Sequence, residues 1–174
     1  MLIINSLKNL LIIFTMLPSI SWSFDFKGIK LGAASTVTEV QEKTGVICGS
    51  GVDPEKTSVC NGDTTIAREP AYMNLLINDG IVQRIDFTLS SDSFDIVAPE
   101  LIKKFGKPTR VRHSVVQNRM GAKYPQVEYL WSSKDGREVR YEKYYFNLDK
   151  SNLNFSTKAD REMLYGGKNR SGDI

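Results

Sequence analysis

Two Asp-Gly pairs, each lying between stretches of alternating apolar and polar residues, constrain the fold of this chain most strongly. The first pair belongs to the segment Asn78-Asp79-Gly80 and the second to Lys134-Asp135-Gly136-Arg137. Asp-Gly suits the positive backbone φ angles of a tight hairpin turn, and a hairpin joins antiparallel strands. We expect strands over residues 72–77 and 81–89 around the first turn, and over 126–133 and 138–147 around the second.

The same reading of periodicity predicts three more strands and three helices. The expected strands cover residues 24–32, 109–117 and 152–157, and the expected helices cover residues 33–44, 93–105 and 158–165. Gly45 is a suitable end for the first helix. Because proline has no N–H to donate in a helix interior, we expect the second helix to begin near Ala98, with Pro99 at its first position.

Together these elements predict an α+β fold for residues 24–165 as a single domain. Consecutive hairpins build a mainly antiparallel sheet of about five to six strands, with two to three short helices on one face. The chain has 174 residues, of which 41% are hydrophobic, and this fits one domain with an ordinary core. Residues 166–174 form a polar tail.

The first 23 residues are typical of a secretory signal peptide. Lys8 is their only charged residue, and residues 10–17 form a short apolar run that ends before a proline. Ser21 and Ser23 place small residues three positions and one position before a cut after Ser23, as signal peptidase requires. We therefore expect an exported protein that is periplasmic or secreted.

An uncleaved membrane anchor over residues 2–17 is the alternative. A spanning helix needs about 20 mainly apolar residues, which this stretch does not provide. There is no cysteine near the expected cut, so a lipoprotein anchor is unsupported, and no later segment is apolar enough to span a membrane. We expect no membrane span after cleavage.

Cys48 and Cys60 are the two cysteines of the chain, and we expect them to form a disulfide. An even number of cysteines in an exported protein favours this pairing. The alternatives are a redox pair, which usually has closer spacing, and a metal site, for which His113 is the single remaining histidine. The polar segment between the cysteines is expected to be a solvent-facing loop that either carries recognition or covers the first helix.

The sequence lacks the motifs of the common catalytic machineries. His113 is the only histidine, and no Gly-x-Ser-x-Gly motif accompanies it. Carboxylate pairs such as Asp92 with Asp95, or Glu138 with Glu142, leave a glycan-cleaving mechanism open. No phosphate-binding glycine loop precedes a helix. We expect a protein that is not an enzyme and has no cofactor or metal.

Aromatic and basic residues are interleaved between Tyr124 and Phe146, a mixture that is enriched in protein-binding faces. The candidate binding residues are Tyr129, Trp131, Arg137, Arg140, Tyr141, Lys143 and Tyr144. The alternative is that one face of these strands packs on helices while the other is solvated. The formal net charge of +3 is too small to indicate nucleic acid as the partner.

Three short motifs resemble those of a group of small exported bacterial domains. They are Gly28-Ile29-Lys30-Leu31-Gly32, Asn78-Asp79-Gly80 and Phe105-Gly106-Lys107-Pro108-Thr109, and a strand with Trp131 follows. In this order they resemble the β-lactamase-inhibitor-protein-like group, which includes small lipoproteins of outer-membrane assembly. The resemblance covers residues 26–155 and implies protein binding or envelope assembly, without catalytic residues. The lipobox cysteine of the lipoprotein members is missing, so the resemblance does not extend to a membrane tether.

The sequence thus predicts a non-enzymatic exported domain that binds an envelope or extracellular protein. One alternative is an inhibitor of a host or competitor envelope enzyme, carried by a phage or plasmid. A less favoured alternative is an envelope hydrolase that uses a carboxylate pair.

Overall fold

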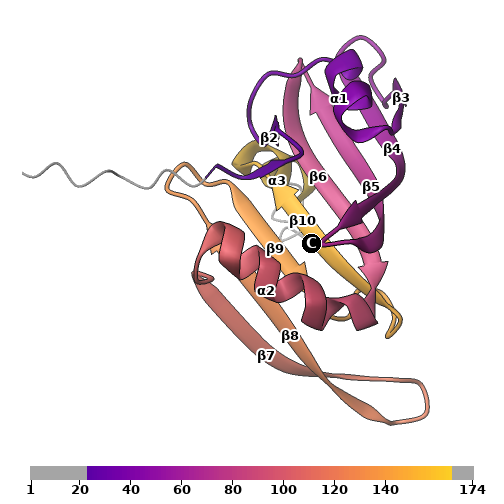
Figure 1. The fold of residues 1–174 in the computed structure, drawn as a ribbon, viewed down its shortest axis with the longest axis vertical. Helices are drawn as coiled ribbons and strands as arrows, with labels where there is room; N and C mark the ends of the chain where they lie inside the picture. Colours follow the sequence, from indigo (N-terminus) through magenta and orange to yellow (C-terminus); the bar gives the residue numbers. More distant parts are fainter. Residues whose placement is uncertain (1–22, 166–174) are drawn as a thin grey trace, which may run out of the picture.

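The computed structural model describes residues 23–165, which form three helices and ten strands (Figure 1). The strands are β1 (Asp25–Phe26), β2 (Ile29–Lys30), β3 (Ile47–Ser50), β4 (Thr57–Ile66), β5 (Glu69–Asn78), β6 (Ile81–Ser90), β7 (Arg110–Gln117), β8 (Lys123–Ser132), β9 (Glu138–Glu142) and β10 (Lys150–Ser156). The helices are α1 (Val37–Thr44), α2 (Phe94–Phe105) and α3 (Lys158–Tyr165), and a 3-10 turn, η1 (Ser91–Ser93), precedes α2.

Eight of these strands form one antiparallel sheet in the order β3-β4-β5-β6-β10-β9-β8-β7. The α+β class and the antiparallel sheet are confirmed, but the sheet has eight strands where about five to six were predicted. The first two strands form a separate two-stranded sheet. Residues 24–32 are therefore two short strands, because Lys27 and Gly28 have positive φ angles of 47° and 77° and reverse the chain.

The two additional strands of the main sheet come from the segment around the cysteines. The residues between the cysteines were expected to be a solvent-facing loop, and residues 51–56 are such a turn, but the residues on either side of it are strands. Strand β4 pairs with β5 along its whole length, from Thr57 opposite Asn78 to Ile66 opposite Glu69. The ten residues of β4 include three threonines, one valine and one isoleucine, which suit a strand, but the segment is too polar to show an apolar alternation. Only Cys60 in this strand is buried.

The predicted turns shape the hairpins. Asp79 and Gly80 have φ angles of 49° and 72° and join β5 to β6, so the first predicted hairpin is confirmed. The second hairpin joins β8 to β9 through a longer turn, in which Gly136 has a φ of 82° and donates its N–H to the carbonyl of Ser133 at 3.0 Å. Both turns use residues that adopt positive φ at little cost.

The first two helices follow the predicted spacing, with one correction. Thr36 caps α1 through the N–H of Glu39, and Gly45 ends it with a φ of 77°. Helix α2 begins at Phe94, so Pro99 lies inside it and not at its start. Pro99 is on the exposed side of the helix, where the carbonyl that loses its partner remains accessible to water.

The helices do not all lie on one face of the sheet. Ile85 of β6 and Val139 of β9 point into the core under α2, and their neighbours Arg84 and Glu138 point to the opposite face. Residues of α3 contact these two neighbours, so α3 lies on the face that α2 leaves open. The prediction that the helices share one face is wrong for α3.

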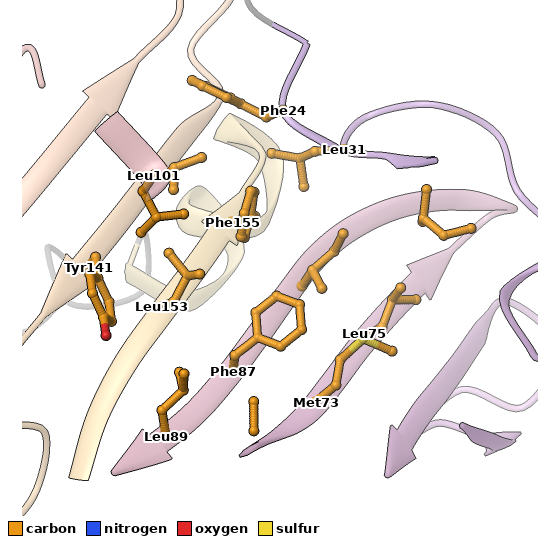
Figure 2. Close-up of a cluster of buried hydrophobic side chains, with 14 of the residues drawn as sticks. Phe24, Leu31, Met73, Leu75, Phe87, Leu89, Leu101, Tyr141, Leu153 and Phe155 are labelled. Atoms are coloured by element: carbon orange, nitrogen blue, oxygen red, sulfur yellow. The ribbon is translucent and has the colours of Figure 1, made fainter. Parts of the chain in front are cut away.

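The core lies between the sheet and α2. Phe87 of β6 and Phe155 of β10 meet edge to face with ring centres 6.0 Å apart, and Phe105 of α2 meets Phe155 at 5.9 Å. Figure 2 shows Phe87, Leu153 and Phe155 projecting from neighbouring strands, beside Leu101 of α2. Trp131 is fully buried against Phe105, and its indole N–H donates to the carbonyl of Gly106 at 2.8 Å.

The core begins at the residue that follows the predicted signal-peptide cut. Ser23 is exposed, whereas Phe24 is fully buried, with its ring 5.4 Å from that of Phe105. The rest of the predicted signal peptide and the predicted tail, residues 166–174, lie outside the described residues. Within residues 23–165, no helix has the length and apolar character needed to cross a membrane.

The predicted disulfide is confirmed, and one of its cysteines belongs to the core. Cys48 and Cys60 are directly opposite each other on β3 and β4, at one edge of the sheet, and Cys60 is fully buried in the hydrophobic core. Exchanging both for serine removes a constraint on a short loop and puts a polar residue at a buried position. We expect the free energy of unfolding to fall by about 3 kcal/mol, as measured by denaturant titration. Unchanged unfolding of the double variant would contradict a stabilising role.

Candidate functional site

The predicted binding residues are divided between the two faces of the sheet. Along a strand, successive side chains point to opposite faces, so an interleaved sequence of aromatic and basic residues separates into two sets. Trp131 and Tyr141 are 0% exposed and belong to the core, where the Tyr141 ring stacks on Phe94 at 4.6 Å. Tyr129 is half-buried on the same side and stacks on Phe94 at 5.7 Å. Burial raises the pKa of Tyr141 to about 12.

Two of the basic candidates are held by interactions within the chain. Lys143 forms an ion pair with Asp95 of α2 at 3.1 Å and lies 5.6 Å from the centre of the Phe94 ring. Arg137 forms an ion pair with Asp135 at 2.8 Å and donates to the carbonyl of Leu31 at 3.3 Å. These contacts give both side chains a role in fixing the fold.

Tyr144 lies beyond the end of β9, which stops at Glu142 and not at the predicted residue 147. The Gln126 side chain explains the early end, because its amide bonds the N–H of Tyr144 at 2.9 Å and the carbonyl at 2.8 Å. The Gln126 side chain thus makes the two hydrogen bonds to the Tyr144 backbone that a residue of a neighbouring strand would otherwise make. The Tyr144 ring is half-buried beside Tyr124, with ring centres 6.2 Å apart.

Arg140 is the predicted binding residue that lies on the open face of the sheet. This face is hollowed between the sheet and α3 into a groove of about 440 Å³, which we call the polar groove. The polar groove is lined by Val59, Asn74, Arg84, Asp86, Glu138, Arg140, Glu142, Tyr145, Asn152, Asn154, Ser156, Asp160, Arg161 and Leu164. Most of these side chains are polar or charged, and five strands and α3 contribute them.

Two arginines connect α3 to the sheet at one side of the polar groove. Arg161 forms an ion pair with Glu138 at 3.4 Å and donates to the carbonyl of Gly136 at 2.6 Å. Arg84 forms an ion pair with Asp160 at 3.5 Å. The Asp160 carboxyl is 1% exposed, and this burial raises its pKa, while Arg84 and Arg161 oppose the shift. The two arginines and the two carboxylates, Glu138 and Asp160, therefore compensate one another's charge.

A cluster of amides holds the carboxylate in the middle of the polar groove. Asp86 of β6 accepts hydrogen bonds from the side chains of Asn152 at 2.9 Å and Asn154 at 3.2 Å. Asn152 also donates to the carbonyl of Phe87 at 3.1 Å. Asp86 is thus fixed by neutral donors, and no cation forms an ion pair with it among the described residues.

The Arg140 side chain has no hydrogen bond or ion pair to any residue of the described part of the chain. It is half-buried on β9, opposite Leu130 of β8 and Asn154 of β10. Its neighbours on the same strand face are Glu138, which pairs with Arg161, and Glu142. A half-buried guanidinium group with unused donors is available for a carboxylate from outside the chain.

Glu142 lies opposite Glu128 of β8, so two carboxylates meet on adjacent strands. Such partners have Cα atoms about 4.5–5.5 Å apart, and like charges at this position repel. Glu128 is 4% exposed and forms an ion pair with Arg112 at 3.1 Å. Burial raises the pKa of Glu142, Glu128 raises it further, and Arg140 and Arg112 oppose both effects.

One carboxylate pair considered from the sequence is not at catalytic spacing. Glu138 and Glu142 are four residues apart on one strand, or about 13 Å, whereas glycosidases need less than roughly 9.5 Å. In the other pair, Asp95 forms an ion pair with Lys143, and Asp92 lies in η1 and does not line the polar groove. His113 is exposed on β7. In residues 23–165, no three His, Cys, Asp or Glu side chains are grouped in a way that could hold a metal ion.

A second hollow, of about 710 Å³, lies beside α2 and the turn between β4 and β5. The side chains at its floor are Leu101, Phe105, Leu153 and Phe155, and each is at most 6% exposed. Its walls add the exposed Ile96 and the half-buried Phe26 and Ile66, so this hollow is mainly apolar. None of the predicted binding residues lines it, whereas Arg140 lines the polar groove, and we therefore take the polar groove as the candidate site.

Comparison with protein-family models, with curated proteins and with solved structures found no match to this chain.

Part of the polar groove has a signal in the sequence. Asn152 and Asn154 alternate with the apolar residues of β10, as Gln126 and Glu128 alternate with those of β8. This alternation indicates a second, polar face of the sheet. Only the β10 residues of these line the groove, and this depends on strand order, which the alternation does not contain.

The raised pKa of Glu142 predicts a pH-dependent effect of the Glu142→Gln exchange. The folded state binds this proton more tightly than the unfolded state, whose pKa is near 4.5, so Glu142 lowers stability as pH rises through the raised pKa. The variant lacks this loss. We expect its stability relative to the unmodified protein to increase between about pH 4 and pH 7 in urea unfolding.

Glu55→Gln is the matched control, because it removes one carboxylate from an exposed turn that does not line the polar groove. If the stability difference between Glu142→Gln and the unmodified protein is constant over this pH range, the pKa of Glu142 is not raised in the folded state.

Proposed function

We propose that this chain is a non-catalytic, exported binding domain that holds a protein partner on the open face of its sheet, in the cell envelope. The observation that carries this is Arg140, a half-buried arginine in the polar groove without a partner of its own. Its guanidinium donors, which no group of the described chain binds, are available for a carboxylate of the partner. Arginine is also enriched among the residues that dominate binding energy in protein interfaces.

The surroundings of Arg140 favour a polar protein surface as the partner. Asp86, Arg140 and Glu142 line the same groove and form no ion pair among the described residues, so one cation and two carboxylates can pair with groups of a partner. A protein surface can present a carboxylate and hydrogen-bond donors at matching positions. Tyr144 and the exposed ring of Phe146, which is 93% accessible, add aromatic surface beyond the end of β9.

Localisation in the envelope is part of the proposal. The disulfide between Cys48 and Cys60 is of the kind that persists in oxidising compartments. The signal-peptide pattern of residues 1–23 and the resemblance to the β-lactamase-inhibitor-protein-like group point in the same direction. An inhibitor of a host or competitor envelope enzyme, encoded by a phage or plasmid, is a special case of the same binding role. If the purified chain inhibits an enzyme that it captures, the inhibitor role is supported.

Reversing the charge of Arg140 tests the binding role. We expect Arg140→Glu to weaken capture of the partner from envelope extract by about tenfold or more, because it places a third carboxylate where the partner's carboxylate would bind. Tyr144→Ala is expected to weaken capture less. Both are measured by titrating the immobilised chain against the captured protein.

Arg68→Glu is the matched control, since Arg68 is an exposed arginine in the turn between β4 and β5, away from the polar groove. We expect Arg68→Glu to capture the partner as well as the unmodified chain does. Equal capture by Arg140→Glu, with unchanged thermal unfolding, would remove the open face from the interface.

One observation favours a second candidate, an envelope hydrolase. Glu128 and Glu142 are direct cross-strand partners, as two neighbouring carboxylates of a retaining glycosidase could be, and burial and Glu128 raise the pKa of Glu142, the direction that a general acid requires. Against this, Glu128 is buried and already paired with Arg112.

If this second candidate is correct, the chain releases reducing sugar from envelope polysaccharide, and Glu142→Gln lowers the rate by at least about a hundredfold. Glu162→Gln, in an exposed position on α3, controls for net charge and is expected to retain the activity. No sugar release by the unmodified chain would exclude this reaction.

A further inference from the structure

Strand β7 is the last strand at one edge of the eight-stranded sheet. It pairs with β8 on one side, and no described strand pairs with its other side. Seven of its eight residues are exposed. In Figure 1 the β7–β8 hairpin extends past the end of α2, so this helix does not cover its tip. An edge of this length is a template for an additional strand.

The backbone groups that face outward can be identified from the register. Asn118 donates its N–H to the carbonyl of Ala122 at 3.0 Å, at the turn of the β7–β8 hairpin. Bonded and non-bonded pairs alternate along an antiparallel ladder, so the even-numbered residues of β7 bond to β8. The N–H and carbonyl groups of Val111, His113, Val115 and Gln117 therefore point to the free edge.

The side chains of β7 alternate in the same way. Val111 lies opposite Tyr129, on the face of the sheet that α2 covers, and Val115 lies further along this face. Their exposed fractions are 42% and 63%. Arg110 and Arg112 lie on the open face, and β7 contains no acidic residue. Arg112 pairs with Glu128, whereas Arg110 has no ion pair within the described chain.

We infer that the free edge of β7 binds an extended segment of a partner protein in which acidic and apolar residues alternate. Added as a ninth strand, such a segment places its acidic residues beside Arg110 and Arg112 on the open face. Its apolar residues then lie beside Val111 and Val115 on the other face. The backbone ladder supplies affinity, and this alternation supplies specificity. The inference rests on the proposed function only in taking a protein as the partner.

Charge favours a foreign acidic segment over a second copy of this chain. In a symmetric pairing of two β7 strands, a second set of arginines approaches the first and no carboxylate is contributed by either β7. The hairpin around these strands carries Arg110, Arg112, Arg119 and Lys123 against Glu128 alone, so two copies repel. An acidic segment meets the same groups with attraction.

The probe is a labelled eight-residue peptide that alternates Glu and Val, with fluorescence anisotropy on the full chain as the measurement. The comparison peptide has the same composition, with its four Glu residues in one block. We expect the alternating peptide to bind at least about tenfold more tightly, because only it can match both faces of β7 at once. Equal binding of the two peptides would indicate charge attraction alone and would overturn the inference.

Val115→Pro tests the use of the strand edge. This exchange removes an N–H that points outward and leaves the bonds between β7 and β8 in place, so the hairpin is retained. We expect the alternating peptide to lose at least about tenfold in affinity. Val115→Thr keeps the N–H and the branched side chain and is expected to bind within about threefold of the unmodified chain. Full binding by Val115→Pro would overturn the inference.

Two further variants complete the test. Arg110→Glu is expected to weaken the alternating peptide and to favour one in which Lys replaces Glu. Arg140→Glu is expected to leave peptide binding unchanged, because Arg140 is on β9 and not at the edge. The two proposals can therefore be tested separately. The peptide can fail to bind to β7 although the polar groove binds its partner, and the peptide can bind although the polar groove does not. Sedimentation measures self-association of the chain in parallel. If the chain self-associates, if Val115→Pro abolishes this and if the peptide does not bind, the edge of β7 binds a second copy of the chain and the inference is overturned.

Discussion

The pairing of β10 with both β6 and β9 holds the molecule together. The chain first builds β3 to β6, then the separate group β7 to β9, and its last strand enters between them. On one face this pairing brings Phe155 beside Phe87 and Val139 in the core. On the other face it brings Asn152 and Asn154 to Asp86. The core and the polar groove thus depend on the same strand, and losing its register would disrupt both.

The sequence was sufficient for those parts of the fold that depend on local chemistry. The turn at Asp79 and Gly80, the end of α1 at Gly45 and the pairing of Cys48 with Cys60 follow from backbone preference and from cysteine count. The strand β4 was missed, because Thr57–Ile66 is too polar to show which face is inside. Its strand character comes from pairing with β5 along its whole length, a tertiary effect that strand preference does not report.

The candidate site was predicted less well, and alternation explains why. Reading the aromatic and basic residues of β8 and β9 as one surface combined two faces that the sheet separates. Trp131 and Tyr141 are buried under α2, whereas Arg140, next to Tyr141 in sequence, is on the open face. Which face is open depends on where the helices pack, and α3 packs opposite α2. Neither residue spacing nor composition determines that choice.

The arginines of β7 show how one feature can protect an edge and still make it selective. An unpaired edge invites association with any extended chain, and charged side chains discourage it. Arg110 and Arg112 repel basic segments and second copies, and an added apolar segment leaves Arg110 without an ion pair at the new interface. A segment that supplies carboxylates at every second position removes this cost. The two arginines therefore disfavour most added strands and favour segments in which acidic and apolar residues alternate.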